Sequence, residues 1–137
     1  MNNFDLKIFT DGGARGNPGP AACAFVVEKK GKTFFKKSKY LGVTTNNVAE
    51  YSAVIEAFEW MTANKLFFEK VAFFLDSQLV VRQLKGIYKI KKEHLKDCYF
   101  KIKKLEEKFS SIEYFFVPRE ENFSADELLN QELDRNV

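Results

Sequence analysis

Apolar residues change their spacing several times along the chain, and these changes separate predicted strands from predicted helices. The first third contains three short apolar segments divided by turn residues, among them Lys30-Gly31-Lys32. We expect these segments, residues 4–10, 21–29 and 33–41, to form an antiparallel meander.

The remainder of the chain alternates helical and strand patterns. Residues 71–75 (VAFFL) are apolar without interruption, which is typical of a central strand covered on both faces. This order of elements predicts an α/β fold, a mixed five-stranded sheet of three antiparallel and then two parallel strands, with helices on both faces. The other elements expected are helices at 47–63, 77–85, 95–109 and 124–133 and a strand at 112–117.

Length and composition favour a single domain spanning residues 1–137. A chain of 137 residues with 45% hydrophobic side chains can bury roughly two thirds of its unfolded surface. The start of the chain has no long apolar run, so we expect a cytoplasmic protein with neither a signal peptide nor a membrane anchor. Cys23 and Cys98 lack CxxC spacing and are interpreted as buried thiols rather than as zinc ligands or a disulfide.

The net charge of +3 is unevenly distributed. Residues 85–108 contain nine lysines against four acids, whereas the rest of the chain is slightly acidic. This segment is either the solvated face of a helix or a surface that contacts phosphates, and charge alone does not decide between the two.

Four acids draw attention, although each has a local explanation. Asp11 precedes a glycine turn, and Glu50 follows Asn47 at the spacing of a capping box. Asp76 could cap the helix that follows it, and Asp126 falls in the first turn of the last helix.

Helical geometry weakens the local explanation for Glu50. The residues on its face include Ala53, Val54 and Ala57, and no Lys, Arg or His lies there. A carboxylate that faces the core needs a partner. If the strands before Asp11 and Asp76 are parallel neighbours, those two carboxylates are adjacent and cannot both ionise without a cation. A cluster of carboxylates without His or Cys favours Mg²⁺ or Mn²⁺.

Four segments resemble the motif blocks of type 1 ribonucleases H, in the same order and over nearly the whole chain: FTDGGARGNPGP, TTNNVAEYSAVIEA, FFLDSQLVVRQLKG and VPREENFSADELL. The resemblance implies a ribonuclease H-like fold and endonucleolytic hydrolysis of the RNA strand of an RNA/DNA hybrid, leaving 5′-phosphate and 3′-hydroxyl ends. By this resemblance the family's catalytic, metal-binding carboxylates match Asp11, Glu50, Asp76 and Asp126. Two ions suit this chemistry, with Asp11 between them, Glu50 and Asp76 completing one site and Asp126 serving the other.

The glycine-rich segment is interpreted as a contact for nucleic acid rather than for a nucleotide. It lacks the Gly-Lys-Ser/Thr ending of a P-loop and runs into a strand, so no nucleotide cofactor is expected. The backbone of Gly12, Gly13 and Gly16 could approach a minor groove, where ribose 2′-hydroxyls mark RNA.

Further substrate contacts come from the resemblance and from the lysine-rich segment. The resemblance adds Asn17, Asn46 and Gln78, for which turn and cap roles are the alternative. The lysines expected to contact phosphates are Lys89, Lys91 and Lys92.

The chain departs from many members of the family in the loop before the last helix. Those members have a histidine there, whereas PREENFSA has none and leaves Arg119, Glu120 and Glu121 as candidates to replace it. The single histidine, His94, is expected to be exposed at a helix start and not to be catalytic.

Two other classes of protein share some of these features with a ribonuclease H. A non-catalytic nucleic-acid-binding module would use the basic segment but has no need for a core-facing Glu50 beside three more acids. A transposase or integrase relative shares the sheet and the carboxylate chemistry, but such domains lack the NPGP hairpin and the TTNN helix start. We therefore expect a ribonuclease H, acting as a monomer.

Overall fold

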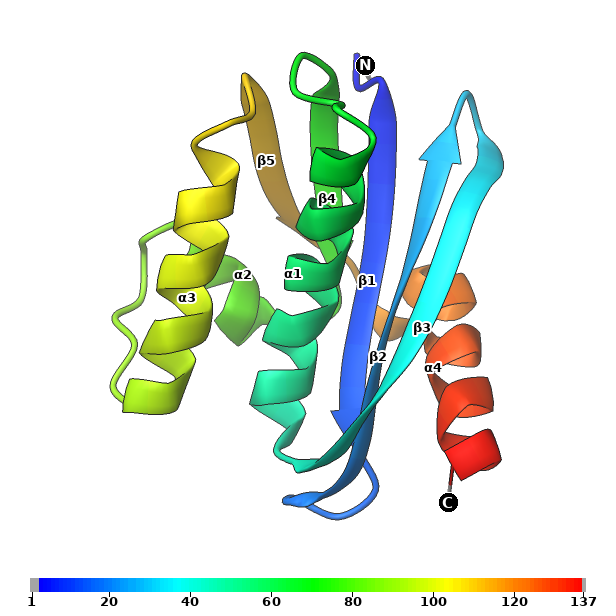
Figure 1. The fold of residues 1–137 in the computed structure, drawn as a ribbon, viewed down its shortest axis with the longest axis vertical. Coiled ribbons are helices and arrows are strands. Elements are labelled where there is room, and N and C mark those ends of the chain that lie inside the picture. The colour runs from blue at the N-terminus through cyan, green and yellow to red at the C-terminus, as the bar shows by residue number, and fades with distance from the viewer. Residues whose placement is uncertain (1–2, 137) are drawn as a thin grey trace.

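A five-stranded sheet forms the middle layer of the molecule, in the order β3-β2-β1-β4-β5 (Figure 1). This computed structural model describes residues 3–136. β1, β2 and β3 pair antiparallel, whereas β4 pairs parallel with both β1 and β5, which confirms the predicted mixed sheet. The strands are β1 (Leu6–Ala14), β2 (Gly19–Lys29), β3 (Lys32–Thr44), β4 (Lys70–Leu75) and β5 (Ser111–Phe116).

Helices cover both faces of the sheet, as predicted (Figure 1). α1 (Asn46–Ala63) and α3 (Glu93–Glu106) lie on one face, and α4 (Phe123–Asn136) lies on the other against β1, β2 and β3. A short helix, α2 (Gln78–Leu84), follows β4, and a 3-10 turn, η1 (Arg119–Asn122), precedes α4. The sequence pattern did not predict η1.

The larger core lies between the sheet and α1 with α3. Phe58 of α1 stacks on Phe73 of β4 at a ring separation of 4.9 Å, and both side chains are fully buried. A smaller cluster under α4 contains Ala22, Ala24 and Leu129. No helix among residues 3–136 is both long enough and apolar enough to cross a bilayer.

The two cysteines are reduced thiols without a disulfide between them. Cys23 is buried in β2, as predicted, whereas Cys98 is only half-buried on α3. The prediction of two buried thiols is therefore correct for Cys23 and wrong for Cys98, which packs against the edge of the larger core and is only partly covered.

β1 is longer than the sequence predicted. The expected strand ended at Thr10, but β1 continues to Ala14 because β2 carries small residues opposite it, with Asp11 paired to Ala24. Gly12 is needed for packing, since a Cβ atom there would lie 2.1 Å from the backbone oxygen of Ala49 in α1. Asp11 therefore lies within a strand and not at its end.

Candidate active site

The four predicted carboxylates line one pocket of about 500 Å³. It opens where the sheet divides: the parallel pairing of β1 with β4 ends at Thr10 and Leu75, and β1 continues beside β2 alone. Asp11 follows Thr10, and Asp76 follows Leu75, so two of the acids lie side by side at this point. In chain order, the four carboxylates belong to Asp11 in β1, Glu50 in α1, Asp76 directly after β4, and Asp126 in α4.

Asp11 is the most deeply placed of the four, with 6% of its surface exposed. One carboxylate oxygen, Oδ1, accepts a hydrogen bond from the Gly12 N–H at 2.9 Å, but the buried Oδ2 has no partner. Burial raises the pKa of Asp11 to about 8, and the negative charges of Asp76 and Asp126 add to this effect. Oδ1 of Asp126 is likewise buried without a hydrogen-bond partner.

Glu50 does not form the capping box that its spacing from Asn47 indicated. Thr45 caps α1, with its hydroxyl accepting from the Val48 N–H at 3.3 Å, so Glu50 lies beyond the first turn. Burial raises the pKa of Glu50 to about 7, the charge of Asp76 raises it further, and a hydrogen bond from Ser77 opposes the rise. Glu50 is half-buried and has no cationic partner within residues 3–136, so the predicted core-facing carboxylate lies only partly covered, and the alternative capping role was wrong.

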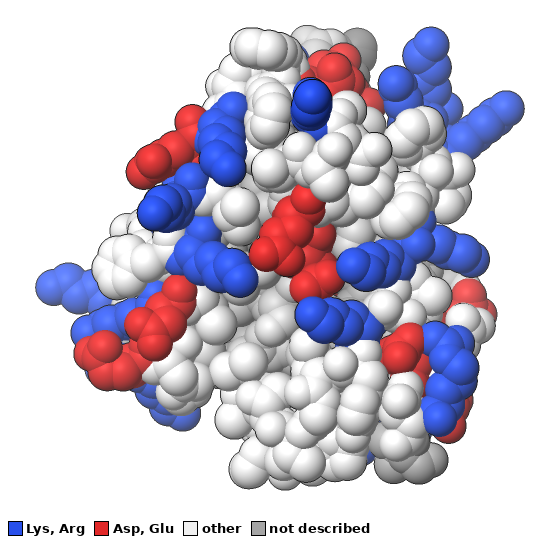
Figure 2. All heavy atoms as spheres, viewed as in Figure 1, with Lys and Arg blue, Asp and Glu red and all other residues white. Residues whose placement is uncertain are grey.

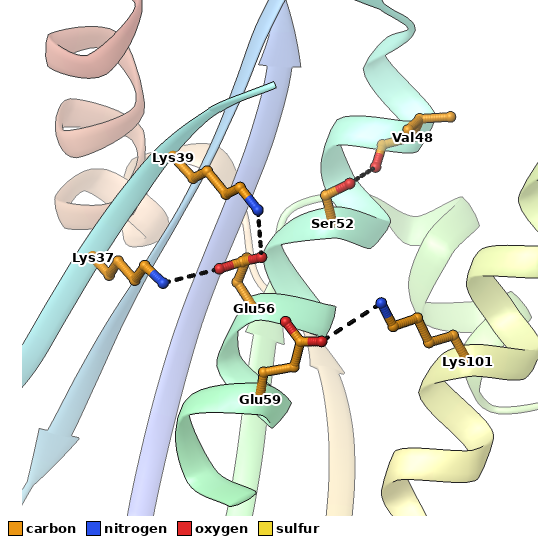
Figure 3. Close-up of polar contacts among 7 residues, drawn as sticks. All are labelled: Lys37, Lys39, Val48, Ser52, Glu56, Glu59 and Lys101. Atoms are coloured by element: carbon orange, nitrogen blue, oxygen red, sulfur yellow. Dashed lines mark hydrogen bonds and ion pairs between the residues drawn. The ribbon is translucent and has the colours of Figure 1, made fainter. Parts of the chain in front are cut away.

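The other acids of α1 have the cationic partners that Glu50 lacks. Figure 3 shows Glu56 between Lys37 and Lys39 of β3, with N–O distances of 3.1 and 3.2 Å, and Glu59 paired with Lys101 of α3 at 3.5 Å. Neither of these two glutamates lines the pocket.

Asp76 does not cap α2. Ser77 does so, because its hydroxyl accepts a hydrogen bond from the Val80 N–H at 3.2 Å. Burial raises the pKa of Asp76, hydrogen bonding by Asn122 and the charge of Arg119 lower it, and the charge of Asp126 raises it. The Asp76 carboxylate therefore has no capping role in α2 and lines the pocket instead.

The donor set of this pocket fits a hard divalent cation. It consists of carboxylates, and two of their buried oxygens, Asp11 Oδ2 and Asp126 Oδ1, have no donor. As they stand, no three His, Cys, Asp or Glu side chains within residues 3–136 are in position to hold an ion. Burial first, and the negative charge of Asp76 second, raise the pKa values of Asp11 and Glu50, and a bound cation would offset both effects.

The predicted asparagines hold the glycine-rich turn against α1. Asn46 Oδ1 accepts a hydrogen bond from the Ala14 N–H at 2.8 Å, and the Asn46 N–H donates to Asn17 Oδ1 at 3.0 Å. These bonds correspond to the turn and cap roles that the sequence offered as the alternative to substrate contact. Asn46 also lines the pocket. Gly12 and Gly13 line it too.

The remaining predicted contacts lie outside the pocket lining. Gln78 is exposed at the start of α2, and Gly16 lies in the turn after β1. The three lysines at positions 89, 91 and 92 are exposed in the connection between α2 and α3, which runs along the outer side of α3 in Figure 1. On the face seen in Figure 2, Lys and Arg are spread among Asp and Glu and form no single basic patch. His94 is exposed in the first turn of α3, as predicted.

The structure places two residues of η1, Arg119 and Asn122, at or near the carboxylates. Arg119, one of the candidates to replace the missing histidine, lines the pocket with its guanidinium 3.9 Å from Asp126. Asn122 was not predicted as a site residue, yet it is buried and donates to the Thr10 carbonyl oxygen at 2.8 Å. The signal available in the sequence was its place in PREENFSADELL, four residues before Asp126.

Comparisons with known proteins agree on one family. The model of the family described as "Reverse transcriptase-like" matches residues 9–132. The structure of LC11-RNase H1 in complex with RNA/DNA hybrid, from a protein isolated from compost by a metagenomic approach, superposes with a TM-score of 0.90 at 43% identity, covering 96% of this chain and 98% of that one. RNase H1 from the archaeon Halobacterium salinarum NRC-1 gives a TM-score of 0.88 at 35% identity, covering 95% and 98%. The bifunctional protein Rv2228c of Mycobacterium tuberculosis is 41% identical over 131 residues, which are 94% of this chain and 35% of that protein, so the chain spans about a third of this relative.

Proposed function

Because the chain belongs to the type 1 ribonuclease H family, we propose that it is a metal-dependent endoribonuclease that hydrolyses the RNA strand of RNA/DNA hybrids. The observation that carries the proposal is the pocket in which four carboxylates from four elements converge, two of them with buried oxygens that lack a donor. The proposed products are RNA fragments with 5′-phosphate and 3′-hydroxyl ends.

The proposed cofactor is a pair of Mg²⁺ or Mn²⁺ ions held by the four carboxylates. When bound, such ions activate a water molecule and stabilise the charge on the departing 3′ oxygen. Asp11, which neighbours both Asp76 and Asp126, would contribute to both ions. Glu50 and Asp76, whose charges act on each other, would complete one site, and Asp126 would serve the other.

The chain's own residues would bind and orient the hybrid around this pocket. Gly12, Gly13 and Gly16 leave backbone accessible to the RNA strand, and only RNA offers 2′-hydroxyls in the minor groove. Asn17 and Asn46 fix the shape of the turn that carries these groups. Gln78 is proposed as a further contact, with Lys89, Lys91 and Lys92 binding phosphates.

Arg119 is the proposed substitute for the loop histidine found in other members. Its side chain is 78% exposed at the mouth of the pocket and lies 3.9 Å from Asp126. A guanidinium stays protonated at neutral pH, so it can neutralise phosphate charge but is not suited to proton transfer. A monomeric, cytoplasmic enzyme that needs no nucleotide cofactor remains our prediction.

The test compares four labelled substrates, RNA/DNA hybrid, single-stranded RNA, duplex RNA and duplex DNA, each with Mg²⁺, with Mn²⁺ and with a chelator. We expect cleavage of the RNA strand of the hybrid with either ion and none with the chelator. Treatment of the fragments with a phosphatase or a 5′-phosphate-dependent exonuclease identifies their ends. Binding of the hybrid without cleavage under every ion condition would instead support a non-catalytic binding module.

A further inference from the structure

Asn122 occupies the point where β1 and β4 separate. It ends η1, has 1% of its surface exposed, and belongs to the few buried polar residues of the described chain. Thr10 and Leu75 form the last parallel pair of the two strands, and the next residue in each strand is a carboxylate. Asn122 bonds to Thr10 and therefore meets β1 one residue before Asp11.

The hydrogen bonds of Asn122 fix the orientation of its amide. Nδ2 donates to the Thr10 carbonyl oxygen at 2.8 Å, and because a carbonyl can only accept, the nitrogen must face β1. The same side chain lowers the pKa of Asp76 by hydrogen bonding to its carboxylate, which also requires a donor. A primary amide has two N–H groups, so one can bind Thr10 while the other is available to the Asp76 carboxylate.

The other end of the amide has no partner within residues 3–136. Oδ1 of Asn122 is buried without a donor, as are Asp11 Oδ2 and Asp126 Oδ1. Buried polar atoms in folded proteins are nearly always hydrogen-bonded, directly or through water. Asn122 Oδ1 is therefore an acceptor for which the described residues supply no donor, and a water molecule of a hydrated cation would provide one.

We propose that Asn122 is a positioning residue of the active site, which holds Asp76 relative to Asp11 through Nδ2 and accepts a hydrogen bond through Oδ1 from a water of the bound divalent cation. This inference rests on the proposed function. Residues that orient metal ligands typically change metal affinity or activity by roughly 10- to 100-fold when they are replaced.

The experiment compares Asn122→Ala with wild type and with Asn64→Ala. Asn64 is a matched control because its amide also donates to a backbone oxygen at 2.8 Å, but at the far end of α1 and in an exposed position. Mn²⁺ binding is followed by calorimetry without substrate, and hybrid cleavage is measured as a function of Mn²⁺ concentration. We expect Asn122→Ala to raise the Mn²⁺ concentration needed for half-saturation about 10-fold or more in both assays, and Asn64→Ala to leave it unchanged.

A measurement on wild-type protein guards against misfolding of the variant. The side-chain amide signals of Asn122 and Asn64 are followed by NMR during titration with Mg²⁺. We expect the Asn122 signals to shift with the same midpoint as binding, and the Asn64 signals to stay in place. If Asn122→Ala lowers the melting temperature alone, or if the Asn122 signals ignore a saturating ion, the residue is only a structural latch and the inference fails. If wild type neither binds the ion nor cleaves the hybrid, the proposed function fails first.

Discussion

Among single side chains, Asp11 shows most clearly what the pocket lacks without a cation. Its pKa of about 8 means that the buried carboxyl is largely protonated at neutral pH in the metal-free protein. A divalent cation binds only the ionised form, so binding must displace this proton. Asparagine has the same shape without the charge, which separates the role of the carboxylate in catalysis from its effect on stability.

We predict that Asp11→Asn and Asp76→Asn nearly abolish hybrid cleavage while the fold persists. Removing one of several crowded acids should raise the melting temperature of the metal-free protein at neutral pH by roughly 2–8 °C, about 1 kcal/mol in a domain of this size. Single-turnover cleavage and thermal melting in chelator measure the two effects. Asp97→Asn, which changes an exposed aspartate on α3, is the control and should alter neither. Near-normal cleavage by either pocket variant would refute the assignment of these carboxylates.

We predict that His94→Ala changes the cleavage rate less than about threefold, far below the roughly 100-fold loss expected for a general acid or base. The imidazole is exposed on α3 and does not line the pocket. Single-turnover rates of wild type and variant are compared between about pH 6 and 9, a range that brackets the usual histidine pKa. Loss of a rate-controlling ionisation near neutrality in the variant would show that His94 reaches the active site.

Among the helices, α2 depends most on its contacts. It has seven residues, too few for a stable isolated helix, and it begins directly after Asp76 and Ser77. Near its other end, the buried Tyr51 hydroxyl donates to Gln83 Oε1 at 2.5 Å, and Lys103 Nζ donates to the Leu84 carbonyl oxygen at 2.6 Å. Tyr51 follows Glu50 in α1, so the first of these bonds ties α1 to the helix that follows Asp76.

We predict that Tyr51→Phe destabilises the protein by about 1–3 kcal/mol, because it leaves the buried Gln83 side chain without its donor. Cleavage should also weaken, since α2 begins two residues after Asp76. Denaturant unfolding and cleavage at saturating Mn²⁺ test the two parts. Tyr40→Phe removes a hydroxyl from a partly buried tyrosine near α4 and serves as the control. A Tyr51→Phe protein as stable as wild type would contradict the role given to this bond.

The connection between α2 and α3 provides a second prediction for an element. If its lysines contact phosphates, replacing Lys89, Lys91 and Lys92 together by alanine should weaken hybrid binding and flatten its salt dependence by up to roughly 0.9 log units per lost contact on a B-like duplex. Binding is measured without cleavage, using Asp11→Asn as the background. The control replaces Lys29, Lys30 and Lys32, which lie at the β2–β3 hairpin near the N-terminal end of the chain and far from the start of α1 in Figure 1. An equal loss in both triple variants would indicate unspecific attraction.

For the protein as a whole, the pocket makes metal-free stability depend on pH. The pKa of Asp11 rises from 3.8 to about 8 and that of Glu50 from 4.5 to about 7 on folding. The folded state therefore binds protons that the unfolded state has released. The stabilisation from these protons is complete below the unfolded pKa values and is lost as pH rises through the folded ones.

We predict that the metal-free protein melts at progressively lower temperature from about pH 5 to pH 8.5, the window set by these shifts. Mg²⁺ should raise the melting temperature more at the upper end, where the carboxylates are ionised and their repulsion is unrelieved. Asp11→Asn should flatten the decline in chelator. Melting curves at several pH values, with and without Mg²⁺, provide the measurement, and a melting temperature that increases over this window would contradict the raised pKa values.

The elements and the chemistry of the pocket can be predicted from the sequence alone. The spacing of apolar residues predicted the five strands and four helices. An element that buries one face repeats its apolar residues at the period of a strand or of a helix, and this repeat is visible within a short stretch of sequence. It also indicated that Glu50 faces inward, since the helical period places it beside Ala53 and Val54. The motif blocks supplied the family and the four acids. All of these inferences use residues close together in the chain.

Features that depend on residues far apart in the chain are visible only in the folded protein. β1 runs through Asp11 to Ala14 because the small residues of β2 pair with it, and local turn chemistry could not reveal that pairing. Thr45 rather than Asn47 caps α1, within a helix start that Asn17 and Asn46 tie to the glycine-rich turn. Asn122 became a site residue through a bond to Thr10, 112 positions away. The local spacing of apolar residues shows which face of an element is buried. Which distant backbone group contacts that face depends on how the elements pack.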